Sequence, residues 1–100
     1  MAEVTLEPEQ YVTVEYTLPK KTFVDLELES DLPVKSYIVG PVALRRYREG
    51  STTFKYWGGF PDPRRHQQQK VWIPFSGAVF LLIMNPSKRD PADVEFELSF

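Results

Sequence analysis

A chain of 100 residues that is 42% hydrophobic and 14% aromatic has the size and apolar content of one folded domain, which excludes intrinsic disorder. It contains no cysteine, which excludes disulfides, thiol nucleophiles and thiolate metal sites. The formal net charge of −2 conceals a balance of −6 over residues 1–34, +6 over 35–70 and −2 over 71–100.

Apolar and polar residues alternate along much of the chain, a pattern typical of strands with one face in water. In chain order, we expect strands at residues 4–7, 11–18, 23–29, 34–39, 52–57, 70–75, 78–84 and 92–100. Residues 42–49 are expected to hold at most a short helical turn, with Gly50 as its cap. The pattern predicts one all-β domain over residues 1–100, a mostly antiparallel β-sandwich of seven to eight short strands, as in a jelly roll.

The segment "GAVFLLIMN" does not alternate, because Phe80, Leu82 and Met84 face away from the side that the neighbouring apolar residues form. Antiparallel strands normally expose one polar face, so these three side chains need a cover. Two interpretations are open: residues 58–70 or 42–49 cover the strand, or it is a protein–protein surface, including one for self-association.

Residues 55–70, "KYWGGFPDPRRHQQQK", differ in composition from the rest. Pro61 and Pro63 predict that 60–69 is an exposed loop, and long loops in compact domains are often functional. We expect a basic and aromatic surface made by Tyr56, Trp57, Arg64, Arg65 and Arg45. Such a surface suits a phosphate-bearing anion or a carbohydrate. Nucleic acid is not expected, because the domain as a whole is acidic.

The acidic residues suggest a Ca²⁺ site or acid–base chemistry, since Asp25, Glu27 and Glu29 share one strand face. A solvated strand face is the commoner explanation, so we expect no metal and no cofactor. Direct pairing of the acidic segments 23–29 and 92–100 would be repulsive, and we expect each to neighbour a neutral or basic strand. His66 is the only histidine, and no nucleophile motif or phosphate loop occurs.

Residues 71–100, "VWIPFSGAVFLLIMNPSKRDPADVEFELSF", resemble the end of GOLD-type β-sandwich domains, in which a glycine-led strand ending in asparagine precedes a final alternating strand. In addition, "YREGSTTFKYWGG" at 47–59 with "VWIPFSG" at 71–77 is similar to a small bacterial β-sandwich family of unknown function that occurs beside TIR domains. The resemblance implies an interaction module, such as an adaptor or sensor domain, and supplies no catalytic residues.

The sequence therefore predicts a non-catalytic protein–protein interaction module that binds a protein partner or a second copy. Its expected binding residues are Phe80, Leu82, Met84, Tyr56, Trp57, Arg64, Arg65 and Arg45. The alternative is a domain that binds an anionic or carbohydrate ligand through residues 55–70. No secretion signal is visible and the longest apolar run, "AVFLLIM", is too short to span a bilayer, so we expect a soluble, cytoplasmic protein.

Overall fold

A computed structural model describes all residues, 1–100, as six strands and one helix. In chain order the elements are β1 (Ala2–Leu6), β2 (Tyr11–Leu18), β3 (Thr22–Val39), α1 (Pro41–Arg48), β4 (Gly58–Ile73), β5 (Gly77–Met84) and β6 (Ala92–Ser99). All strand pairs are antiparallel, which confirms the prediction of a mostly antiparallel all-β protein.

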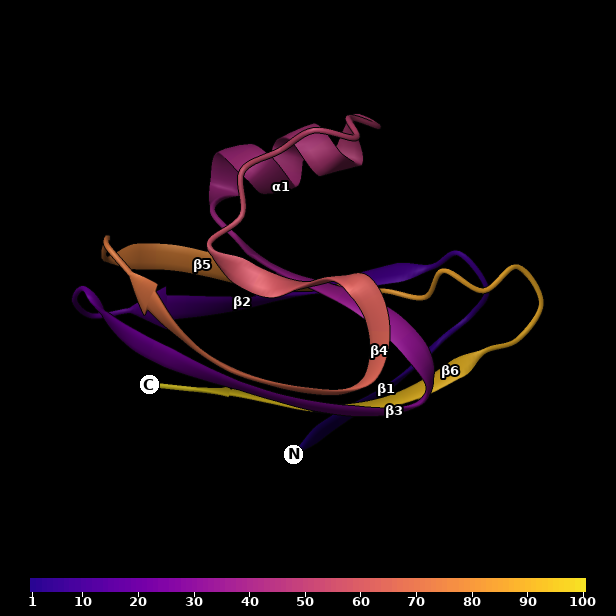
Figure 1. Ribbon diagram of the computed structural model, residues 1–100. Coiled ribbons are helices and arrows are strands. Elements are labelled where there is room, and N and C mark those ends of the chain that lie inside the picture. The colour runs from indigo at the N-terminus through magenta and orange to yellow at the C-terminus, as the bar shows by residue number, and fades with distance from the viewer.

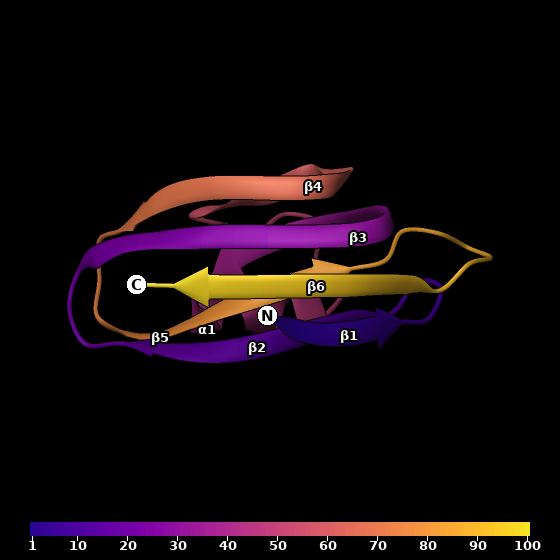
Figure 2. The same cartoon turned by 90° about the horizontal axis from the view of Figure 1, so that it is seen from below.

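The six strands form one connected sheet that curls over on itself. Its order is β1-β6-β3-β5-β2, and β4 pairs with the other edge of β3. One edge of β3 meets β6 over residues 25–30 and β5 over residues 35–39, so β3 passes from one layer to the other. Figure 1 shows β3 and β4 curving together, with β1 and β6 below and β2 and β5 above. Seen from below in Figure 2, β4, β3, β6 and β1 lie side by side.

The structure has fewer and longer strands than the sequence pattern indicates. The predicted strands at 23–29 and 34–39 are parts of β3, and their junction contains register shifts rather than a break. Residues 52–57 form no strand; they belong to the connection between α1 and β4. The predicted strands at 4–7, 11–18, 78–84 and 92–100 correspond to β1, β2, β5 and β6.

The prediction that residues 60–69 form a loop is wrong, because they lie within β4, which pairs with β3. Most of these residues are exposed, as expected. Pro61 and Pro63 fall in the irregular stretch of the ladder, between the paired residues Phe60 and Arg64. β4 pairs with β3 alone, so a proline there removes no hydrogen bond to a second neighbour. The position of β4 at an edge therefore explains how a proline-containing segment can be a strand.

A hydrogen-bonded network of polar side chains holds the bend of β3 and β4. Gly59 donates its amide N–H to Gln69 Oε1 over 2.7 Å, and Phe60 donates its own to Ser36 Oγ over 3.1 Å. Ser36 Oγ in turn donates to Gln67 Oε1. Gln67 is only 3% exposed, so this glutamine is part of the interior and not of a solvated loop.

The core between the two layers is made by the inward-facing apolar side chains of all six strands. Its buried members are Leu6, Leu18, Val24, Leu26, Leu28, Val34, Ile38, Val71, Ile73, Val79, Leu81, Ile83, Ala92, Val94, Phe96 and Leu98. In β2 and β6 these residues occupy the apolar positions of the alternating pattern, which is why that pattern locates the two strands well.

The outward-facing side of β5 is covered by α1, and this decides between the two interpretations of that strand. Leu82 is 0% exposed and packs in a second cluster with Val39, Ala43 and Leu44. Phe80 and Met84 are half-buried against the same cluster. Leu82 is therefore an internal residue, and the proposal that it forms a partner surface is corrected. α1 is also longer than the short turn expected, with eight residues.

We predict that Gly59→Ala destabilises the fold strongly and that Gly50→Ala does so only mildly. Gly59 has φ +108°, and a Cβ there would lie 2.7 Å from Tyr37 Cα, so strain and overlap add to more than about 3 kcal/mol. Gly50, at φ +87°, has no atom within 4 Å of such a Cβ and should cost about 1 kcal/mol. Urea unfolding of both variants gives the comparison, and equal losses would contradict a close approach at Gly59.

Candidate functional site

The most distinctive surface is the outward face of the lower layer, formed by β1, β6 and the adjoining halves of β3 and β4. Eight of the 14 acidic residues of the chain extend from this surface, which we call the acidic face. They are Glu3, Asp25, Glu27, Glu29, Asp31, Asp93, Glu95 and Glu97. The acidic face lies on the opposite side of the molecule from α1 (Figure 1).

The two acidic segments pair directly, so the expectation that they would avoid each other is wrong. Segment 23–29 does have a neutral and basic neighbour on its other edge, where β4 supplies Lys70, Gln68 and His66. Glu27 lies opposite Glu97, and Glu95 lies between Glu29 on β3 and Glu3 on β1. Like charges directly opposite one another on antiparallel strands are destabilising. The register is nevertheless imposed by the inward side chains, because a shift of one residue would turn the apolar set outward.

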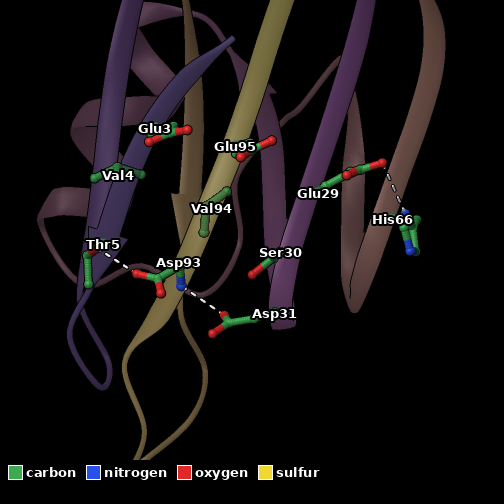
Figure 3. A pocket seen from close by; sticks show the side chains of 10 residues that line it. All are labelled: Glu3, Val4, Thr5, Glu29, Ser30, Asp31, His66, Asp93, Val94 and Glu95. Atoms are coloured by element: carbon green, nitrogen blue, oxygen red, sulfur yellow. Dashed lines mark hydrogen bonds and ion pairs between the residues drawn. The ribbon is translucent and has the colours of Figure 1, made fainter.

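A shallow polar groove crosses the middle of this face, and Figure 3 shows its side chains. Asp93 accepts a 2.7 Å hydrogen bond from the Thr5 hydroxyl, and its amide N–H donates to Asp31 Oδ1 over 2.8 Å. Glu29 Oε1 lies 3.6 Å from His66 Nδ1 on β4. Glu3 and Glu95 form no ion pair, so the centre of the groove carries uncompensated negative charge.

The carboxylates of the acidic face extend outward along the strands instead of converging on a point. No group of three or more His, Asp or Glu side chains is arranged to hold a metal ion. What this arrangement offers chemically is an extended anionic surface, which attracts cationic groups over a broad area.

An aromatic pair lies at one end of the acidic face. Trp72 on β4 is 47% exposed and packs edge-to-face on Phe23 of β3, with 5.0 Å between the ring centroids. The Lys70 ammonium lies 5.2 Å from the Phe23 ring, across from Asp25. The sequence pattern did not indicate this pair, because the register of β3 against β4 is what brings the two rings together.

The basic and aromatic residues expected to act together are distributed over separate places. Arg64 and Arg65 lie on the bend of β4, where the Arg64 guanidinium stacks 5.0 Å from the Phe60 ring. Arg45 is on α1, 3.9 Å from Glu49. Trp57 packs on Phe75, with 5.6 Å between the ring centroids.

Tyr56 belongs to an aromatic cluster beside α1 that sequence analysis missed. The rings of Tyr37, Tyr47, Phe54 and Tyr56 make edge-to-face contacts of 5.0 to 6.3 Å, and Tyr11 joins through Tyr47. Burial raises the pKa of Tyr37 and of Tyr47 above the ordinary value, with smaller contributions from neighbouring tyrosines. No pattern along the chain indicates this cluster, because its members come from β2, β3, α1 and a loop.

Neither a scan of the chain against protein-family models nor a search among curated proteins finds a match. The resemblance to GOLD-type domains and to the bacterial family therefore stays a prediction. The one helix, α1, is neither long enough nor apolar enough to cross a membrane.

We predict that Glu95→Gln stabilises the domain. The change removes two like-charge contacts, with Glu3 and with Glu29, and should raise the free energy of unfolding by about 1 kcal/mol at low salt. Glu15→Gln is the control, since Glu15 lies opposite Phe80 and has no acidic partner across the strand. Thermal unfolding at low and high salt tests this, and a stabilisation that does not shrink with salt would contradict the electrostatic origin.

A second prediction concerns alkaline pH. Because the pKa values of Tyr37 and Tyr47 are raised in the folded state, the unfolded chain releases those protons first. Their contribution to stability is complete below the unfolded pKa of 10.0 and is lost as pH rises through the folded values. Tyr37→Phe combined with Tyr47→Phe should flatten the fall in melting temperature above pH 10, and an unchanged slope would count against it.

Proposed function

We propose that this domain is a non-catalytic interaction module that binds a cationic surface of a partner protein through its acidic face. The observation that carries the proposal is the placement of Glu95 directly between Glu3 and Glu29. Each like-charge contact costs the free domain stability. A partner that supplies lysine or arginine side chains relieves this repulsion. The binding free energy is therefore more favourable than it would be at an isolated carboxylate.

The aromatic pair adds a second kind of contact to the same surface. Trp72 and Phe23 are both about half exposed and adjoin Asp25. Exposed aromatic rings beside charged groups are typical of interface anchors, because the rings bury a large apolar area with little loss of side-chain freedom. The acidic face therefore combines charge for attraction with an apolar anchor for affinity.

The alternative of an anion-binding domain built on Arg64 and Arg65 has less support. Those two arginines lie on the bend of β4, while Tyr56 is held in the aromatic cluster next to α1. Arg45 already has an acidic neighbour, Glu49, on its own helix. The residues expected to converge on one anion thus do not form one site.

The test compares two triple variants with the same net charge. Glu27→Gln, Glu95→Gln and Glu97→Gln neutralise the acidic face, while Glu7→Gln, Glu9→Gln and Glu15→Gln neutralise acids that lie outside it. Calorimetric titration with an oligo-lysine peptide should show affinity reduced about tenfold or more by the first set and much less by the second. Salt should weaken binding to the natural sequence.

If both triple variants lose affinity equally, net charge alone attracts the peptide and the acidic face is not the binding surface. Self-association is a second possibility, and light scattering of the free domain tests it. A stable dimer that persists after the acidic face is neutralised would show that the chain self-associates through another surface. Trp72→Ala tests the aromatic anchor. The substitution should reduce the affinity for a folded cationic partner more than it reduces the affinity for oligo-lysine.

A further inference from the structure

The helix α1 lies on the side of the molecule away from the acidic face (Figure 1). An apolar groove lies beside its first turn. It has a volume of about 410 Å³, within the range of small-molecule sites. Its walls come from α1, from the loop before β4 and from the turn before β5, and they consist mainly of Pro41, Val42, Trp57 and Phe75. Val42 is 55% exposed, so its apolar side chain is accessible to a ligand in the groove.

Two cationic side chains, Arg46 and Lys55, line the same groove. The Lys55 ammonium lies 4.4 Å from the centroid of the Trp57 ring, which holds the charge at the groove wall. Neither Arg46 nor Lys55 forms an ion pair, and no acidic residue lines the groove. The apolar walls and the two unpaired cations are thus complementary to a ligand with an apolar body and an anionic end.

The beginning of α1 adds to the positive potential. The helix starts with Pro41 after Gly40, no side chain caps it, and its first turn contains no acidic residue. The positive end of the helix dipole is therefore not neutralised by the chain itself. This feature supports the charge preference that Arg46 and Lys55 establish, and it would not define a site without them.

We propose that this groove binds a small amphipathic carboxylate, such as a medium-chain or aryl-substituted acid. The apolar body lies between Val42 and Trp57, and the carboxylate meets Arg46 and Lys55. A carboxylate fits better than a phosphate ester, because most of the lining is apolar and only two cations are available. The site is independent of the acidic face, so it can be present or absent whatever the result of the oligo-lysine titration.

Tryptophan fluorescence gives a direct test, because Trp57 is a wall of the groove and Trp72 is the only other tryptophan. In a Trp72→Phe background, octanoate should change the Trp57 emission in a saturable manner below its micelle concentration. Octanol has the same apolar chain without the charge, and it should bind about tenfold more weakly.

The matched variants separate the groove from general basic charge. Arg46→Ala with Lys55→Ala should reduce octanoate affinity about tenfold, to the level of octanol. Arg64→Ala with Arg65→Ala removes the same charge from the bend of β4 and should leave binding unchanged. Val42→Asp, at an exposed position, should abolish octanoate binding without unfolding the chain, which circular dichroism verifies.

Three results would overturn the proposal: octanol binding as tightly as octanoate, equal losses in the two double variants, or no saturable change in Trp57 emission. The first would leave an apolar groove with no charge preference. The second would show that octanoate responds to net charge alone.

Discussion

The fold depends on the close approach of the two layers where β3 and β4 bend together. A side chain at Gly58 would overlap Val71, and one at Gly59 would overlap the backbone of β3. The lack of a side chain at Gly58 leaves room for the Gln69 amide oxygen, which accepts a hydrogen bond from the Gly59 amide N–H. Gln67 accepts a hydrogen bond from the buried Ser36 hydroxyl, so the polar groups at the bend are paired. Because one pair of strands serves both layers, this contact closes the core on one side.

The same bend places acidic and basic residues on different sides of the molecule. The first half of β3 lies in the lower layer and carries acidic side chains outward, and β6 adds its own acids beside it. After the bend the chain enters α1, whose Arg45, Arg46 and Arg48 lie on the other side of the molecule. The acids of β3 and β6 and the arginines of α1 therefore lie on opposite sides of the molecule. The acidic face and the apolar groove with its two cations both follow from the path of β3.

Alternation located β2 and β6 because each has one face toward the core and one face toward water, which is the property that the pattern measures. β5 was found by its continuous apolar run, because both of its faces are covered. Alternation failed at residues 60–69, where the buried side chain is Gln67 and not an apolar one, and where the prolines suit an edge strand. The pairing of β3 with β6 could not be predicted either, since repulsion between glutamates argues against it. The acidic face depends on that long-range pairing. The aromatic cluster depends on how α1 and the loop after it pack on β2 and on the second half of β3.

The energies explain how the fold tolerates an unfavourable surface. A like-charge contact such as Glu27 with Glu97 costs roughly 0.2–1 kcal/mol, whereas burying the inward neighbours contributes about 1.5–3 kcal/mol for each large apolar side chain. Leu26, Leu28 and Leu98 alternate with these glutamates and are all buried. The inward faces therefore determine the register and leave the outward faces free to carry repulsion. The fold does not need the acidic face, and the repulsion on it is unfavourable in the free domain. A cationic partner can therefore stabilise the domain by binding there.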